Sequence, residues 1–382
     1  MQTLSFEPVI SSEKEEALRQ EVRQFLKEYA DFKTADLIDS WTICDPDFSQ
    51  ALAKKGWIGM TWPKQYGGGE KSYLERYVVI EELLAAGAPV GAHWVADRQS
   101  GPLLLRFGTE SQREFFLPQI IKGECFFAIG MSEPNSGSDL ASIKTTAERV
   151  DGGWRVNGAK IWTSWAHACQ YMITLCRTAP VSDNRHAGMS QLIIDLRSDG
   201  ITVNPIKNMA GDEHFNEIFF DNVFVPDEHV AGKVDDGWNQ VMAELAFERS
   251  GPERFLSSYQ LFEASIGELK QTDLDSRIMA VIGQFAAKLM VLRQMSLSVA
   301  SQLQQGKLPV NEASVVKDLG TTFEQELPDA MRSIMPIEAR STANSGVARL
   351  LSDSILKAPS FSLRGGTREI LRGIIARGLG LR

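Results

Sequence analysis

Apolar residues recur with a helical period over the first third of the chain. The first such stripe follows the sequence from Ser12 to Glu15, which has the S-x-x-E form of a capping box. It consists of Leu18, Val22, Phe25, Leu26 and Tyr29. The same spacing returns in residues 73–84 and 102–122, where it predicts one helix and then a helical pair. We therefore expect this part of the chain to be helical.

The pattern changes near Gly123, after which short apolar runs alternate with turns. Residues 145–150 and 154–157 flank Asp151-Gly152-Gly153, and this arrangement is typical of a β-hairpin. Further short runs of this kind are residues 126–131, 171–176, 191–196, 201–206, 217–220 and 223–226. Regularly spaced short strands with turns between them predict a small barrel or sandwich.

Helical spacing returns from about Asp235 and continues to the C-terminus. The order of elements predicts an α+β fold with an N-terminal helical domain (1–123), a middle β domain (124–234) and a C-terminal helical bundle (235–382). This order is not an alternating β–α–β pattern, and no G-x-G-x-x-G sequence follows a predicted strand. Both observations argue against a dinucleotide-binding Rossmann domain.

Composition and charge narrow the range of functions. The chain has 382 residues, 43% of them hydrophobic, and its net charge of −9 argues against binding to nucleic acid or to an anionic membrane surface. No apolar run reaches the roughly 18 residues of a membrane span, and the first residues lack the pattern of a secretory signal. The four cysteines show no CxxC pairing and no ligand spacing with histidine. We therefore expect a cytoplasmic protein with structural thiols and no metal centre.

Two segments in the predicted β domain carry candidate chemistry. Residues 131–139 read MSEPNSGSD, a strand that runs into a turn rich in small polar groups. Such a turn presents backbone N–H groups and hydroxyls, which suit the edge of a heterocycle or a phosphate. Residues 157–164 read NGAKIWTS, where Trp162 could stack on or flank a planar ring. Taken alone, both segments are also compatible with an ordinary β-domain loop and a core tryptophan.

Together, the two segments closely resemble the TEP-x-x-GSD and NG-x-K-x-W-I-T segments of the acyl-CoA dehydrogenase family. The resemblance extends along nearly the whole chain and includes residues 56–68, 101–123, 214–223, 366–370 and 380–381. It implies the fold of that family, an FAD cofactor and α,β-dehydrogenation of an acyl-CoA thioester, as in fatty acid or lipid degradation. An electron-transfer flavoprotein is the electron acceptor that the resemblance implies.

The resemblance also implies roles for individual residues. The residues expected to contact the flavin are Ile129, Met131, Ser132, Trp162, Ser164, Thr367 and Glu369. Among them, Trp162 and Ser164 would flank the isoalloxazine ring, and Thr367 and Glu369 would approach it from the C-terminal domain. Ser138 lies where the family contacts the pantetheine of CoA.

The catalytic base needs a separate argument, because this chain departs from a common pattern. Many members carry the base as a glutamate directly before the C-terminal Gly-Thr, where this chain has Gly365. Other members carry it on the first long helix of the C-terminal domain, before an arginine, and Glu248-Arg249 matches that place. We predict Glu248 as the base, with Gly365 leaving space for its carboxylate and Arg249 contacting CoA. The alternatives are a solvated Glu248 and an Arg249 paired with Glu253, which is the reserve candidate for the base.

Two segments that bind the ADP half of FAD in typical members are absent from this sequence. The chain has neither the R-x-x-F-G segment nor the Q-x-x-G-G-x-G segment, and residues 265–272 and 333–340 stand in their places. We therefore expect either a homo-oligomer or a related second subunit that completes the FAD site in an α2β2-type enzyme. Two other functions stay open: a flavin oxidase or monooxygenase that uses O2, and a non-catalytic partner subunit.

Overall fold

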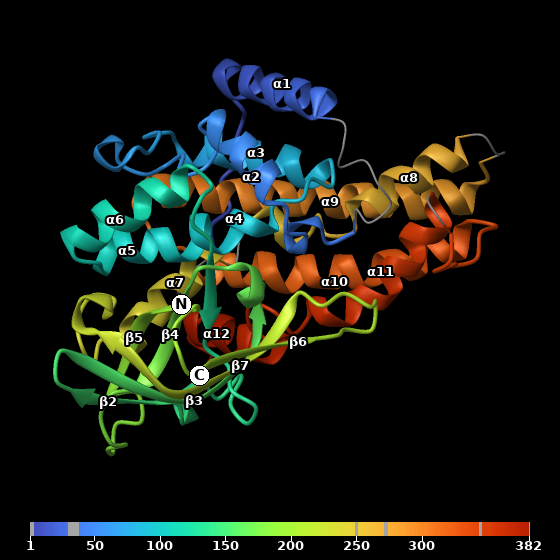
Figure 1. Cartoon of the computed structure of the whole chain (residues 1–382). Coiled ribbons are helices and arrows are strands. Elements are labelled where there is room, and N and C mark those ends of the chain that lie inside the picture. Colours follow the sequence, from blue (N-terminus) through green and yellow to red (C-terminus); the bar gives the residue numbers. More distant parts are fainter. Residues whose placement is uncertain (1–3, 30–37, 249–250, 271–273, 344–345, 382) are drawn as a thin grey trace. The chain divides into compact units, whose positions relative to one another are not determined.

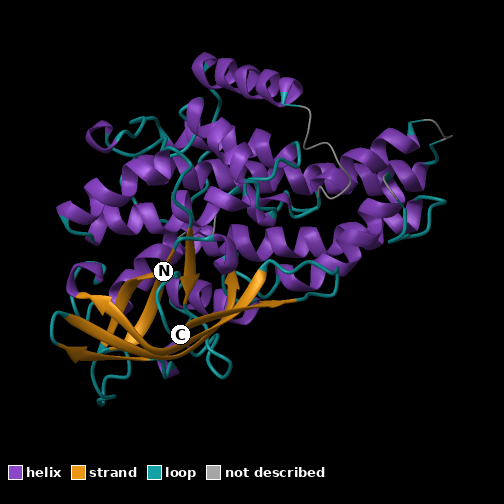
Figure 2. Ribbon diagram, viewed as in Figure 1, coloured by secondary structure: helices purple, strands orange, loops and turns teal. Residues whose placement is uncertain are grey.

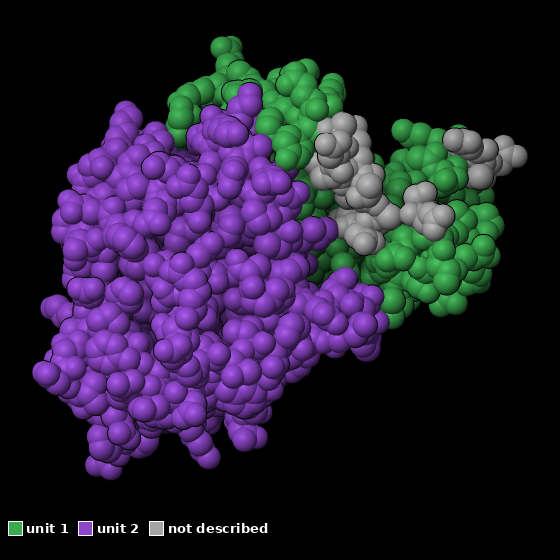
Figure 3. Space-filling view, viewed as in Figure 1, with its two compact units in different colours: residues 1–41, 71–89, 248–382 green, residues 42–70, 90–247 purple. Residues whose placement is uncertain are grey.

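The computed structural model describes residues 4–29, 38–248, 251–270, 274–343 and 346–381, without the side chains of 244–248. The chain forms two compact units, shown in different colours in Figure 3. Unit 1 consists of Met1–Trp41, Lys71–Pro89 and Glu248–Arg382, and unit 2 consists of Thr42–Glu70 and Val90–Phe247. Each unit is thus built from stretches that are separated in the sequence. The three-domain boundaries expected from the sequence stay a prediction.

Unit 1 is helical (Figure 1). Its helices are α1 (Glu13–Glu28), α3 (Tyr73–Ala85), α8 (Tyr259–Leu269), α9 (Ser276–Gln304), α10 (Val310–Ile334), α11 (Val347–Phe361) and α12 (Arg368–Gly378). The predicted capping box is confirmed, because the Ser12 side chain accepts from the Glu15 backbone and the Glu15 side chain accepts from the Ser12 backbone. Glu81 of α3 joins three helices, since it lies 2.9 Å from Arg19 of α1 and 2.6 Å from Arg293 of α9.

Unit 2 combines short helices with one seven-stranded sheet (Figure 2). The helices are α2 (Pro46–Lys54), α4 (Gly91–Val95), α5 (Gly101–Phe107), α6 (Glu110–Ile121) and most of α7 (Gly237–Glu248). The strands are β1 (Phe127–Gly130), β2 (Thr146–Val150), β3 (Gly153–Ser164), β4 (Tyr171–Arg177), β5 (Met189–Asp195), β6 (Ile201–Ile206) and β7 (Phe215–Pro226). They are ordered β1-β4-β2-β3-β7-β6, with β5 pairing with β4. The predicted order of helices, strands and helices is confirmed.

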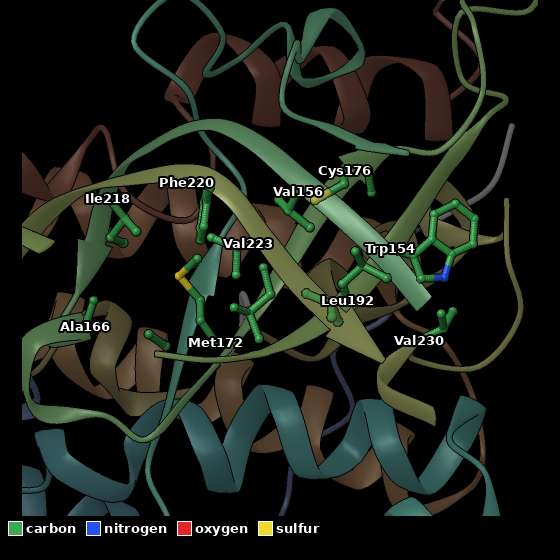
Figure 4. Packing of buried hydrophobic residues seen from close by; sticks show 14 residues of the cluster. Trp154, Val156, Ala166, Met172, Cys176, Leu192, Ile218, Phe220, Val223 and Val230 are labelled. Carbon is green, nitrogen blue, oxygen red and sulfur yellow. The ribbon is translucent and has the colours of Figure 1, made fainter. Parts of the chain in front are cut away.

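The core of the sheet is formed by alternate residues of neighbouring strands. Trp154 and Val156 of β3 point into it together with Met172 and Cys176 of β4 and Leu192 of β5 (Figure 4). All five of these side chains are buried, so the period of two in the sequence places one face of each strand in the core. This packing fixes the register of β3, the strand that ends in Trp162 and Ser164.

The strands differ from the sequence prediction at β3 and β7. The expected hairpin forms, since Val150 pairs with Gly153 across a turn in which Gly152 has a φ of +71°. However, β3 continues to Ser164, and the two runs expected at 217–220 and 223–226 form the single strand β7. The polar residues between those runs predicted a break. Instead, Asn222 takes a φ of +54° and donates its backbone N–H to Asn157, so the strand continues through an irregular pair.

Helix α9 passes the length and composition test for a membrane-spanning helix, although no span was expected from the sequence. Lys288 and Arg293 interrupt its apolar run. Only 11% of its most apolar 18-residue window is buried. Core helices of soluble proteins and signal sequences pass the same test, so the result concerns only the length and composition of α9.

Candidate functional site

The segment that follows β1 is tied to β3 by backbone and side-chain bonds. Ile129 lies in β1 and pairs with Ile173 of β4, and Met131 and Ser132 follow directly, both half-buried. The backbone N–H of Ile161 in β3 donates to the Ser132 carbonyl at 3.0 Å. Three of the residues predicted to contact a flavin, Ile129, Met131 and Ser132, are thus held against the strand that carries two more.

A buried ion pair between Lys160 and Glu133 holds the segment that follows β1 in place. Lys160 is fully buried, and its ammonium lies 2.9 Å from Glu133 Oε1 and 3.0 Å from the Met131 carbonyl oxygen. Glu133 also accepts the backbone N–H groups of Lys144 at 2.6 Å and Thr145 at 2.9 Å. Every charged atom of the pair therefore has a partner, and the turn that contains Glu133 is fixed to β3.

The pKa values of the two groups follow from this arrangement. Burial alone would raise the pKa of Glu133, but Lys160 and the two backbone N–H donors hold that pKa below its usual value. Burial lowers the pKa of Lys160, and the neighbouring Cys176 and Glu133 oppose that change. Burial is thus the largest influence on the pKa of Lys160, whereas the contacts of Glu133 outweigh the effect of burial on its pKa.

Trp162 is exposed in an unusual backbone conformation at the end of β3. Its φ is +62°, which a tryptophan rarely adopts, and the β3–β7 register is irregular between Lys160 and Thr163. As a result the indole is 57% exposed, with its only described ring contact an edge-to-face one with Phe215 at 5.8 Å. Ser164 follows at the strand end and is half-buried. The indole and the hydroxyl thus offer a planar surface and a hydrogen-bonding group side by side.

The remaining predicted flavin residues lie in unit 1, at the start of α12. Thr367 caps this helix, because its hydroxyl accepts the backbone N–H of Ile370 at 3.5 Å. Glu369 lies in the first turn of α12 and is exposed. Hydrogen bonds from its own backbone N–H and from Thr367 lower the pKa of this carboxyl. Their approach to a flavin stays a prediction.

The predicted base lies where α7 ends. Glu248 is the last residue of this helix, and its side chain lies outside the described residues, as does all of Arg249. The reserve candidate Glu253 is 1% exposed, and its Oε1 lies 3.5 Å from Nε of Arg254. The space beside Gly365 is already filled, because a Cβ on this glycine would lie 3.1 Å from Nη1 of Arg254. In the described part of the chain an arginine therefore occupies the place that we expected for the carboxylate of Glu248.

A second cluster in unit 2 joins the turn that contains Ser138 to the loop between β4 and β5. Arg177 is 7% exposed and donates to the carbonyl oxygens of Ala141 and Ile143 in one loop and to those of Arg185 and Ala187 in the other. Burial lowers the pKa of Arg177, and nearby Arg185 adds to the effect. This buried guanidinium therefore fixes two surface loops next to each other.

The loops that Arg177 joins present polar groups on the surface. Arg185 forms an ion pair with Asp139, the residue after the exposed Ser138. His186 stacks on Trp238 of α7, with ring centroids 4.2 Å apart and an interplanar angle of 16°. The sequence prediction named Ser138 but not Arg177, Arg185 or the stacked pair, because no local pattern marks a contact between distant loops.

Comparison with known proteins decides the family. The sequence matches the acyl-CoA dehydrogenase N-terminal domain over residues 12–124, the middle domain over 128–223 and the C-terminal domain over 235–380. The chain belongs to the acyl-CoA dehydrogenase family. Its fold is that of an acyl-CoA dehydrogenase, with an N-terminal helical part, a middle curled sheet and a C-terminal helical part. Members of this family are oxidoreductases and flavoproteins, generally with FAD.

Individual acyl-CoA dehydrogenases share about a third of the sequence. FadE34 of Mycobacterium tuberculosis is 33% identical over 333 residues, which is 86% of this chain but 45% of FadE34, so the chain spans less than half of that relative. IpdE1 of Mycolicibacterium smegmatis is 33% identical over 349 residues, 87% of each chain. Among solved structures, the ChsE4-ChsE5 complex from Mycobacterium tuberculosis matches with a TM-score of 0.86 and 27% identity, covering 98% of this chain and 99% of that one.

The residues of unit 2 fit the flavin half of FAD. The segment 129–132 offers backbone groups on a braced loop, Trp162 offers an open aromatic face, and Ser164 offers a hydroxyl. A backbone strain such as that of Trp162 is uncommon and persists where the surrounding structure holds it. An acyl-CoA dehydrogenase needs such a surface for its cofactor, and the flavin contacts of these individual residues stay a prediction.

Trp162 provides a test in which stability and cofactor affinity move in opposite directions. Trp162→Gly removes a side chain that is mostly exposed and relieves the positive φ, so we expect it to raise the free energy of unfolding by about 1 kcal/mol. The same change removes an aromatic contact of about 0.5–1.5 kcal/mol, so flavin should bind roughly 2–10-fold more weakly. Urea denaturation and flavin titration measure the two effects. Trp162→Ala is the matched control, because it loses the ring but keeps the strain; equal stability of both variants would contradict the strain argument.

Proposed function

We propose that this chain catalyses the FAD-dependent α,β-dehydrogenation of an acyl-CoA thioester to the 2-enoyl-CoA and passes electrons to an electron-transfer flavoprotein. The observation that carries the proposal is the braced segment 129–133 beside the exposed Trp162 and Ser164. When bound, FAD would accept the β hydrogen as hydride. Glu248 would take the α proton, for which a carboxylate is suited when burial raises its pKa toward the operating pH.

The residues of the chain have distinct tasks in this reaction. Ile129, Met131 and Ser132 would hold the flavin edge, with Lys160 and Glu133 keeping their backbone in place. The aromatic face and hydroxyl at the end of β3 would flank the ring, and Thr367 and Glu369 would contact it from α12. A preformed binding surface of this kind costs no reorganisation when the substrate reacts.

The CoA part of the substrate would bind at the loops that Arg177 joins. Ser138 would contact the pantetheine, and the exposed guanidinium of Arg185, next to it, suits a phosphate group. The stacked His186 and Trp238 extend the same surface with aromatic rings. Because the chain is acidic, with a net charge of −9, local cations of this kind are needed for an anionic substrate.

Arg185→Ala is therefore expected to raise KM for an acyl-CoA about 5–30-fold with little change in kcat, because it removes a ground-state contact of about 1–2 kcal/mol. Steady-state kinetics of the flavin-loaded enzyme measures this. Arg197→Ala is the matched control, since Arg197 is also exposed and also paired with an aspartate, Asp195, in the same unit. A similar KM increase in both variants would show that the effect is one of overall charge and would contradict the local site.

The surface of α9 supports the proposal that a second chain takes part. The residues of this helix that are exposed between its first and last turns form one stripe without a charged residue. They are Met279, Ala280, Gly283, Gln284, Ala287, Met290, Val291 and Gln294. Their spacing places them on a single face over about four turns. An uncharged face of that length with small residues in the middle is suited to close packing against another helix.

We propose that a related second subunit packs against this uncharged face of α9. The chain lacks the two segments with which typical members bind the ADP half of FAD, so another chain must supply those donors. A similar protein, ChsE4-ChsE5, has a solved structure that is described as a complex. A homo-oligomer is the alternative, and a stable homo-oligomer with one FAD per chain would rule out the second subunit.

The proposed function is tested by the visible spectrum of the chain, purified alone and together with the product of a neighbouring gene, followed by anaerobic titration with acyl-CoA thioesters. Loss of the visible flavin absorbance on addition of a thioester would support the dehydrogenase activity. Rapid reoxidation of that flavin by air would instead indicate an oxidase or monooxygenase. A chain that stays colourless in both preparations would indicate a non-catalytic subunit and end the proposal.

A further inference from the structure

Arg254 lies in unit 1 at the place where a carboxylate was expected. It ends the short 3-10 turn Pro252–Arg254 and is 3% exposed. A Cβ built on Gly365 would lie 3.1 Å from Nη1, 3.3 Å from Cζ and 3.3 Å from Nη2 of this arginine. Three nearly equal distances mean that the planar guanidinium lies flat over the glycine. A longer residue at position 365 would have to displace it.

The arginine is held in this position from several sides. Gly320 of α10 packs against its backbone so closely that a Cβ there would lie 2.3 Å from the Arg254 carbonyl oxygen. Its guanidinium carbon lies 6.0 Å from the centre of the Trp41 ring, and Arg364 lies over the same ring at 4.6 Å. Both the backbone and the side chain of Arg254 are thus fixed by packing, which is the condition for a specific contact rather than a mobile charge.

Among the described residues around Arg254, the carboxylates already outnumber the guanidinium groups, and this decides which kind of ligand the arginine suits. Glu253 lies 3.5 Å from its Nε. Arg364 pairs with Asp39 at 2.6 Å, and its distance to Glu324 is 3.7 Å. A further carboxylate brought into this buried cluster would add an uncompensated negative charge, which is costly. A neutral oxygen needs no such compensation and still gains a hydrogen bond from a charged donor.

This inference rests on the proposed function, in which Gly365 stands at the acyl slot in place of a glutamate. We propose that Arg254 is a specificity-determining residue that donates hydrogen bonds to a neutral oxygen, a ketone or a hydroxyl, carried by the acyl group. The preferred substrate is then an oxygenated acyl-CoA rather than a simple fatty acyl-CoA. A hydrogen bond from a charged donor contributes about 1.5–3 kcal/mol, which corresponds to a roughly 10–150-fold preference.

The test uses the flavin-loaded protein, with its partner subunit where that is needed for loading, and thioesters of equal length. The probes are octanoyl-CoA, its 5-, 6- and 7-oxo and hydroxy derivatives, and the terminal dicarboxylate suberyl-CoA. We expect one oxygenated thioester to exceed octanoyl-CoA in kcat/KM by roughly 10–150-fold. Arg254→Met should reduce that ratio to near unity while octanoyl-CoA is affected less. Binding of the matching non-reacting thioethers, measured by calorimetry, should show the same loss.

Two further variants keep the test decisive if Arg254→Met folds poorly. Arg254→Lys keeps the charge and should retain part of the preference, and Gly365→Ala should reduce it by displacing the guanidinium. Arg332→Met is the control, because Arg332 is an exposed arginine of the same unit and should change nothing. The inference is overturned if the ratio survives in Arg254→Met and Gly365→Ala, if all thioesters slow equally, or if suberyl-CoA is preferred. If no thioester bleaches the wild-type flavin, the proposed function fails first, and this inference falls with it.

Discussion

Lys160→Met is expected to lower the free energy of unfolding by about 3–5 kcal/mol, the largest loss of stability that we predict for a single substitution in this chain. The ammonium is fully buried, and its removal leaves the Glu133 carboxylate without the charge that compensates it. The carbonyl of Met131 loses its donor as well. Urea denaturation of wild type and variant, followed by circular dichroism, measures the difference.

A surface ion pair of similar length provides the control for this prediction. Lys288 lies 2.6 Å from Glu326, with side chains that are 37% and 48% exposed. Lys288→Met removes the same group by the same substitution, and we expect a loss of no more than about 1 kcal/mol because solvent screens the pair. Equal losses in the two variants would mean that burial of the Lys160 pair contributes nothing. The double variant Lys160→Met/Glu133→Gln should recover part of the loss, since it also removes the orphaned charge.

The same pair should control flavin binding as well as stability. Any Lys160 variant that still folds should hold flavin more weakly, because the backbone of Met131 and Ser132 is no longer fixed against β3. A variant that loses stability but binds flavin with unchanged affinity would show that the pair has only a structural role.

Glu248→Gln is expected to slow the bleaching of flavin by an acyl-CoA about 10²–10⁴-fold, the contribution that general-base catalysis typically makes. The amide keeps the size of the side chain but cannot take the α proton. The measurement is anaerobic stopped-flow absorbance of the flavin-loaded protein at saturating thioester, with the flavin content determined beforehand. The flavin content itself should stay unchanged, because Glu248 has no predicted role in binding the cofactor.

Glu253→Gln separates the two candidates for the base. Glu253 is buried beside Arg254, so its replacement should reduce stability and leave the bleaching rate within a few-fold of wild type. If Glu253→Gln abolished bleaching and Glu248→Gln did not, the assignment of Glu248 would be wrong. The comparison is informative because both changes are isosteric and remove one negative charge each.

The parts of the fold that were predictable are those with a local cause. Ser12 and Glu15 cap α1 as expected, since a capping box involves only four residues. The hairpin at Gly152 was predictable for the same reason. By contrast, β7 was expected as two strands, because Asn222 is a turn-forming residue and only its pairing with distant β3 keeps the strand continuous. Local sequence therefore identifies elements better than it sets their ends.

The candidate site divides in the same way. Trp162 and Ser164 could be named as candidates because they lie within a motif that a single segment displays. Glu133 and Lys160 lie in the two motif segments 131–139 and 157–164. The burial of this pair nevertheless depends on how β3 packs against the turn, which the sequence does not state. The contact of Arg254 with Gly365 joins residues that are far apart in the chain, so we expected open space where an arginine lies. Contacts between distant segments are set by tertiary packing, and they are what a single sequence leaves undetermined.

The division of the chain into interleaved units has a consequence for its synthesis. Unit 2 is complete once residue 247 has been made, whereas α1 and α3 belong to a unit whose other helices come from residues 248–382. On the ribosome, Glu81 and Arg19 can meet early, but Arg293 of α9 lies 212 residues after Glu81 and is made on the order of ten seconds or more later. The nascent protein therefore passes through a stage in which the sheet can be folded while α1 and α3 still expose their apolar faces. We expect chaperones to bind the nascent chain during this interval.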